Sequence, residues 1–153
     1  MAVDTTLASL EFSRAKSALS EVMTQVVHEH SPRLVSRHRG KERMLLVRAE
    51  DLADYLDSFR FEPEVVIDRG EVTVELQDLG VLGFGESVEA AMEDLVAELR
   101  VYARRFFERS AFYMHTDRAR HAPWLLRFAL TPQERQLDLL SADSQRAVEP
   151  APV

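Results

Sequence analysis

The chain has 153 residues, 46% of them hydrophobic, and a formal net charge of −7. This length predicts one globular domain, or two small ones that share a core. The absence of cysteine excludes disulfides, thiol catalysis and thiolate-bound zinc. Because the sequence shows neither a run of about 20 apolar residues nor a secretory signal, we expect a bacterial cytoplasmic protein with no membrane-spanning segment.

A first helix is predicted between residue 12 and Pro32, which cannot continue a helix because it has no N–H. Ser13 is the expected N-cap, and the mildly β-prone residues 5–12 are expected to form an edge strand ahead of the helix. Apolar residues recur at helical spacing and predict one buried face. They are Ala15, Leu19, Val22, Met23, Val26 and Val27.

A basic hairpin is predicted next. Two strand-like runs, residues 33–37 and 43–48, flank Arg39-Gly40, which supplies the φ > 0 position of a tight turn. Glu50 and Asp51 then begin a second short helix, whose N-terminal end favours carboxylates.

The order of these elements carries a resemblance. The runs SRAKSALSEVMTQVV, SPRLVSRHRGKERMLLV and AEDLADYL together resemble the N-terminal domain of Phd/YefM-type antitoxins. Ala49 departs from the family pattern, in which a capping Ser is commoner at that position. The resemblance implies a homodimer that binds operator DNA. The matching positions are Ser13, Ala15, Leu19, Arg39, Gly40, Lys41, Glu50 and Asp51.

A second hairpin is predicted over residues 61–68 and 71–76, with Arg69-Gly70 as its turn. Its second strand alternates apolar and acidic residues, which predicts a sheet with one wet, acidic face. Residues 81–84 are expected to add a third strand. Ser87 is the expected N-cap of a long helix, whose apolar positions are Val88, Met92, Leu95, Leu99, Tyr102 and Phe106.

The run VTVELQDLGVLGFGESVEAAMEDLVAELRVYA resembles HicB-type antitoxin domains. No helix-turn-helix or ribbon-helix-helix tail follows, so the resemblance implies the HicB fold and not its mode of DNA binding. A chain that joins both units resembles Phd-like antitoxins of RelE/RelB-type systems. The positions that follow the HicB pattern are Asp78, Leu79, Gly80, Gly85, Glu86, Ser87, Glu89 and Ala90.

The fold class implied is α+β, in four parts. Residues 1–60 are expected to form a Phd-like helix–hairpin–helix unit for DNA binding and dimerisation, and residues 61–109 a HicB-like three-strand sheet with one long helix. Residues 110–142 are expected to form a short helical segment that binds the toxin. The polar, proline-containing residues 143–153 are expected to be a disordered tail.

The helical segment has two signals. Pro123 suits the first turn of an apolar helix, and Thr131-Pro132-Gln133-Glu134 is a capping-box sequence that predicts a further helix start. Its apolar side chains either dock on a toxin or fold back on the long helix as core, and the sequence leaves both open. The candidate toxin contacts are Trp124, Leu125, Phe128, Leu130, Leu137 and Leu140.

The candidate DNA-binding residues lie in the first helix and the basic hairpin. A net charge of −7 by itself argues against nucleic-acid binding, but within residues 33–43 several cations stand against Glu42 alone. Arg suits phosphates and guanine edges because its planar fork donates two parallel hydrogen bonds. The alternative is a solvated turn. The candidates are Arg14, Lys16, Arg37, Arg39, Lys41 and Arg43.

Other patterns predict no chemistry. His28 and His30 point in different directions on a helix, and Gly83-Phe84-Gly85 lacks the third glycine of a dinucleotide-binding turn, so we expect no metal and no cofactor. Carboxylates of the second unit form either a solvated face or a complement to a basic toxin. They are Glu71, Glu75, Glu86, Glu89 and Glu93.

The sequence therefore predicts a non-enzymatic type II antitoxin. It would neutralise a cognate protein toxin by direct binding, and the resemblance suggests a RelE-type ribonuclease as that toxin. It would also repress its own operon through operator DNA. Two alternatives remain: a free-standing transcriptional regulator whose second domain senses a ligand or protein, and a small nuclease, which the lack of a metal-ligand cluster or nucleophile motif disfavours.

Overall fold

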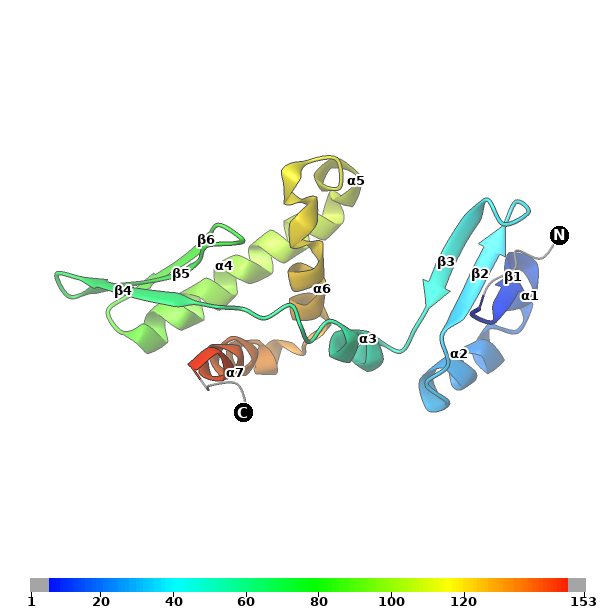
Figure 1. Cartoon of the computed structure of the whole chain (residues 1–153), viewed down its shortest axis with the longest axis horizontal. Helices are drawn as coiled ribbons and strands as arrows, with labels where there is room; N and C mark the ends of the chain where they lie inside the picture. The colour runs from blue at the N-terminus through cyan, green and yellow to red at the C-terminus, as the bar shows by residue number, and fades with distance from the viewer. Residues whose placement is uncertain (1–5, 149–153) are drawn as a thin grey trace. The chain divides into compact units, whose positions relative to one another are not determined.

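The computed structural model describes residues 6–148, with side chains up to Ser144. The chain forms two compact units that divide between Tyr55 and Leu56, each with a three-stranded sheet and helices (Figure 1). The α+β class is confirmed. No helix within residues 6–148 combines the length and the apolar character needed to cross a bilayer.

The first unit is a small sheet with two helices in the connection between its first two strands (Figure 1). The strand order is β1-β2-β3, with β1 parallel to β2 and β2 antiparallel to β3. Its buried side chains are Ala15, Val22, Val26 and Val35. The elements are β1 (Ser9–Glu11), α1 (Phe12–Ser17), α2 (Leu19–His28), β2 (Arg33–Arg37), β3 (Glu42–Leu46) and α3 (Ala49–Tyr55).

The predicted edge strand and hairpin are confirmed, but the first helix differs from the prediction. It is broken at Ala18, whose φ of −117° and ψ of 29° lie outside the helical region. The hydroxyl of Ser17 donates to the Arg14 carbonyl at 3.0 Å, and such bonds compete with helix propagation. Ser13 is not the N-cap: β1 runs directly into α1, so the N-cap position falls on Glu11.

Arg39 and Gly40 of the hairpin turn have the predicted positive φ angles, and His38 before them has a positive φ as well. His38, Arg39 and Gly40 have φ of 54°, 58° and 80°. Three consecutive left-handed residues reverse the chain sharply. The side chains of Arg39 and Lys41, on either side of Gly40, therefore lie at the end of the hairpin.

The second unit is built on an antiparallel meander of order β4-β5-β6 (Figure 1). The predicted cap of the long helix is confirmed, because Ser87 Oγ accepts from Ala90 N at 3.0 Å. Gly83 lets α4 approach the sheet closely, since a Cβ there would lie 2.3 Å from the Ala91 carbonyl oxygen. The elements are β4 (Glu64–Asp68), β5 (Glu71–Leu76), β6 (Val81–Gly85) and α4 (Val88–Glu108).

The remaining helices complete the same core and do not form a separate segment. Leu125 and Phe128 of α6 and Leu140 of α7 are buried with the side chains of α4 and the sheet. The elements are α5 (Ser110–Tyr113), the 3-10 helix η1 (Asp117–His121), α6 (Ala122–Leu130), the 3-10 helix η2 (Gln133–Arg135) and α7 (Gln136–Val148).

Two predictions for this region are wrong. The capping box does not form, because the Thr131 hydroxyl donates back to the Arg127 carbonyl at 2.9 Å and Pro132 starts η2 without a side-chain cap. The predicted disordered tail over 143–153 is helical up to Val148, and Asp143 is only 2% exposed because it is bonded to buried groups. Residues 149–153 lie outside the described residues.

One buried histidine in this core predicts a pH dependence. His121 is 6% exposed, and its Nδ1 lies 2.7 Å from the Tyr102 hydroxyl. Burial lowers the pKa of His121 below its ordinary 6.5, and the charges of Arg120 and Arg118 lower it further. The unfolded chain therefore binds this proton more tightly, so stability present above pH 6.5 is lost as the pH falls through and below that value.

We expect the melting temperature of the second unit to fall between pH 7 and pH 5, and to fall less in His121→Gln. Fluorescence of the single tryptophan, Trp124, reports on this unit. The exposed His115→Gln is the control and should follow the wild type. Equal pH dependence in wild type and His121→Gln would contradict the assignment.

Candidate functional site

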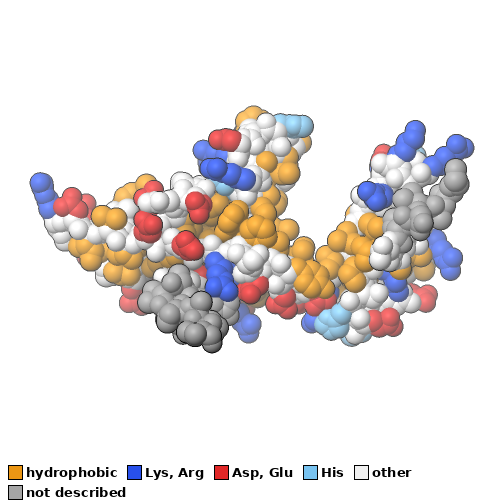
Figure 2. All heavy atoms as spheres, in the orientation of Figure 1, with side chains coloured by type: hydrophobic (Ala, Val, Ile, Leu, Met, Phe, Trp, Pro, Cys, Tyr) orange, Lys and Arg blue, Asp and Glu red, His pale blue; other side chains and the backbone are white. Residues whose placement is uncertain are grey.

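The end of the β2–β3 hairpin is the most basic surface of the first unit. Arg39 and Lys41 are exposed on either side of Gly40, at the end where Lys and Arg side chains gather in Figure 2. Arg14 and Lys16 are exposed on α1. These four predicted DNA-binding cations are accessible from solvent.

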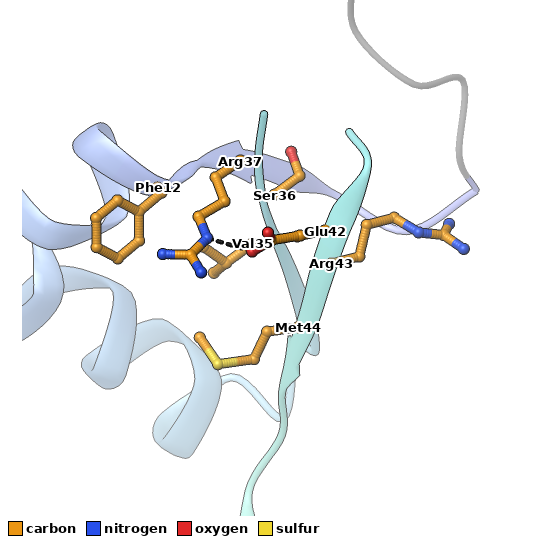
Figure 3. Close-up of a pocket in the computed structure, with 7 residues that line it drawn as sticks. All are labelled: Phe12, Val35, Ser36, Arg37, Glu42, Arg43 and Met44. Carbon is orange, nitrogen blue, oxygen red and sulfur yellow. Dashed lines mark hydrogen bonds and ion pairs between the residues drawn. The ribbon is translucent and has the colours of Figure 1, made fainter. Parts of the chain in front are cut away.

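The other two predicted cations lie on opposite faces of the sheet. Arg37 pairs across the hairpin with Glu42, and its guanidinium also lies 5.9 Å from the Phe12 ring centroid. Arg43 is opposite Ser36 in the register and points away from Arg37 and Met44 (Figure 3). One flat surface therefore cannot present both Arg37 and Arg43.

The Arg37–Glu42 pair compensates the charge of this arginine. The hydrogen bond from Arg37 lowers the pKa of the Glu42 carboxyl, because it favours the ionised form. Arg37 therefore stabilises the hairpin in the free protein through its pair with Glu42. The uncompensated positive charge is concentrated on the turn and on Arg43.

Beside this pair the first unit has an apolar cavity of about 310 Å³. Phe12 and Met44 line it and remain 45% and 53% exposed (Figure 3). On the adjacent α2, Leu19 and Met23 are 56% and 64% exposed, one turn apart on the same face. These four apolar side chains are accessible to solvent on a small unit.

One histidine of this unit, His30, has a structural role. His30 Nδ1 lies 2.9 Å from the Asp51 carboxylate, which ties the end of α2 to the start of α3. Arg48 lies 3.6 Å from the same carboxylate. Among the described residues no group of three or more His, Asp and Glu side chains is placed to hold a metal ion.

The six predicted toxin contacts do not make one exposed surface. Leu125, Phe128 and Leu140 are 0–1% exposed and belong to the core, which is the second of the two possibilities that the sequence leaves open. Trp124 is half-buried, and its indole N–H donates to the Arg60 carbonyl at 3.0 Å. Leu130 and Leu137 are also half-buried.

Sequence reasoning missed a buried ion pair in the same region. Arg127 in α6 donates to both carboxylate oxygens of Asp143 in α7, at 2.6 and 3.2 Å, and both residues are at most 5% exposed. Arg127 also donates to the Phe59 carbonyl at 3.0 Å, and Asp143 accepts from Phe61 N at 2.8 Å. No local pattern predicts the pair, since its members lie in different helices.

Comparisons with known proteins agree with this architecture. A family model described as the antitoxin of RelE/RelB toxin–antitoxin systems matches residues 6–140. A crystal structure described as the antitoxin part of a proposed toxin/antitoxin system from Syntrophomonas wolfei subsp. wolfei has the same fold, with a TM-score of 0.77. Its sequence is 18% identical, over 87% of this chain and 96% of that one. No curated protein sequence matches. Since the family model covers most of the chain, the protein belongs to the Phd-like antitoxin family of RelE/RelB toxin–antitoxin systems.

Proposed function

We propose that this protein is a non-enzymatic type II antitoxin of the bacterial cytoplasm with its two tasks divided between its units. The first unit dimerises and binds operator DNA of its own operon, and the second binds and blocks a cognate protein toxin. Membership of the antitoxin family carries the proposal. The proposal also includes three finer assignments: the first unit is a Phd/YefM-like domain, the second is a HicB-like domain, and the toxin is a RelE-type ribonuclease.

Local charge supports DNA binding by the first unit. Arg39 and Lys41 project from the hairpin turn, and Arg14 and Lys16 from α1, while all of the excess acid of the chain lies after residue 60. Phosphate contacts depend on local cations, so a net charge of −7 does not prevent them. Arg43 adds a cation on the other face, and Arg37 holds the hairpin through Glu42.

Exposed apolar side chains support dimerisation of the first unit. Phe12, Leu19, Met23 and Met44 are each 45–64% exposed, and burying them against a second copy would remove this apolar surface from water. A dimer also doubles the number of basic hairpins that reach one operator.

A charge placed in this apolar surface should separate the dimer. We expect Leu19→Glu with Met23→Glu to halve the mass measured by light scattering and to weaken operator binding, because a charge buried at an interface is costly. Leu19→Met with Met23→Leu, which keeps the apolar surface, should remain dimeric. An unchanged mass for the glutamate variant would place the dimer contact elsewhere.

Direct binding tests the toxin half of the proposal. Each protein encoded next to this gene is purified from a tolerant host and titrated with the full chain by calorimetry. One of them should bind and lose its ribonuclease activity in proportion to the bound fraction. If neither neighbour binds while operator DNA does, the protein is a free-standing regulator.

A further inference from the structure

The free edge of the second sheet exposes an unusual strand. β4 lies at the edge of the order β4-β5-β6, and its Val65, Val66 and Ile67 are 46%, 54% and 67% exposed. Val65 and Ile67 pair with the buried Val74 and Val72 of β5, so they face the side that α4 covers, yet α4 packs mainly on β5 and β6. In Figure 2 charged side chains lie at the tip of this hairpin, and hydrophobic side chains follow along it, further from the tip.

An edge of this kind is a template for another strand. Within residues 6–148, no strand pairs with the backbone N–H and C=O groups on its open side, and Val65, Val66 and Ile67 place apolar side chains on both of its faces. Natural proteins cover or blunt such edges because they otherwise pair without control. Three successive β-branched residues also favour the extended conformation that an added strand requires.

The charges at the ends of β4 argue against a second copy as its partner. In the antiparallel register that pairs all five residues, Glu64 of one copy would lie opposite Asp68 of the other. Like charges directly opposite each other are destabilising. A partner strand with basic residues at these two positions would instead form opposite-charge pairs.

The sheet itself already carries like-charge pairs that such a partner would relieve. In the register of β4 with β5, Glu64 lies opposite Glu75 and Asp68 lies opposite Glu71, with Val66 opposite Thr73 between them. Cross-strand carboxylate pairs cost stability in the free protein. Cations brought in by a neighbouring strand would offset that cost in the complex.

We propose that β4 is the docking edge for the toxin, which adds an extended segment of apolar residues between basic ones as a fourth strand. This inference rests on the proposed function and names the surface that performs it. Backbone hydrogen bonds would supply affinity, and the carboxylates at both ends would fix the register and reject uncharged strands. The helices α6 and α7 would then support the sheet from the core without touching the toxin.

Charge reversal at the two ends of β4 is the first test. In Glu64→Lys with Asp68→Lys, the new side chains face Glu75 and Glu71 and replace like-charge pairs by opposite-charge pairs. Glu64→Lys also removes the exposed hydrogen bond that Glu64 accepts from the Gln77 amide, so the fold should keep about its wild-type stability. Binding of the neighbour-encoded toxin, measured by calorimetry, should weaken about 100-fold or more. Glu98→Lys with Glu108→Lys, which changes the same charge on exposed positions of α4, should stay within about threefold of wild type.

A second variant tests the apolar part without adding charge. Val65→Thr with Val66→Thr keeps the β-branched shape and strand preference but replaces exposed methyl groups by hydroxyls, and should weaken toxin binding about tenfold. In wild type, toxin binding should also slow hydrogen exchange at amides of residues 64–68. A change in the mass of the free threonine variant would instead make β4 a contact between copies and overturn the proposal.

The outcomes separate this inference from the function on which it rests. If wild type binds neither neighbouring protein, the antitoxin proposal itself fails. If wild type binds the toxin and the charge-reversed variant binds it equally well, the toxin docks elsewhere and only the β4 proposal is wrong. Exchange protection confined to α6 and α7 would likewise overturn it.

Discussion

Asp143→Ala should lower the free energy of unfolding of the second unit by about 3–5 kcal/mol, the cost of leaving a buried charge without its partner. Without the carboxylate, the guanidinium of Arg127 would stay buried with its bond to the Phe59 carbonyl, a more distant contact, 3.7 Å, to Asp57, and the face of the Phe61 ring, whose centroid lies 5.9 Å away. The amide of Phe61 would also lose its acceptor. Alanine has a higher helix propensity than aspartate, so a change in helix propensity cannot cause the expected loss of stability.

Urea unfolding followed by Trp124 fluorescence measures the effect, because the only tryptophan lies in this unit. Asp138→Ala removes an exposed carboxylate from the same helix and should change stability by only about 0.5 kcal/mol. A loss below about 1 kcal/mol for Asp143→Ala would mean that the pair does not hold the unit together.

The Arg127–Asp143 pair also matters for how toxin binding is tested. It joins α6, α7 and the segment at Phe59 and Phe61, so the helical region is ordered in the free chain. Deleting everything after α5 would remove Leu125, Phe128 and Leu140 from the core and unfold the unit. Surface substitutions are therefore the sound way to locate the toxin contact.

Arg39→Ala with Lys41→Ala should weaken operator binding about 100-fold. In a dimer the two substitutions remove four phosphate contacts, and at about 0.7 kcal/mol each the loss is roughly 2.8 kcal/mol. The slope of log affinity against log salt should also become shallower by about four, since fewer counterions are released.

Gel shifts on the DNA upstream of the gene, at several salt concentrations, measure both quantities. Arg104→Ala with Arg105→Ala removes the same charge from exposed positions of the second unit and should bind DNA as wild type does. If both variants bind equally well with equal salt slopes, the hairpin does not contact phosphates.

Most elements of the fold could be predicted because local residues specify them. The first helical region ends at His28, before Pro32. Arg39-Gly40 and Arg69-Gly70 adopt the positive φ of tight turns, and Ser87 caps α4. Each of these signals acts within a few residues of its own position.

The rest depends on contacts between distant residues. The separation of Arg37 and Arg43 follows from the hairpin register, which pairs Arg37 with Glu42 and so sends Arg43 to the other face. The end of α7 looks like a polar tail in the sequence, but its Asp143 is fixed by Arg127 and Phe61. The exposure of β4 depends on how much of the sheet α4 covers.

Growth of a bacterial host that expresses each neighbouring reading frame, alone and together with this protein, tests the antitoxin function most directly. We expect one neighbour to arrest growth and co-expression of this protein to restore it. Harmless neighbours on both sides, or an arrest that persists when this protein is present in excess, would contradict it.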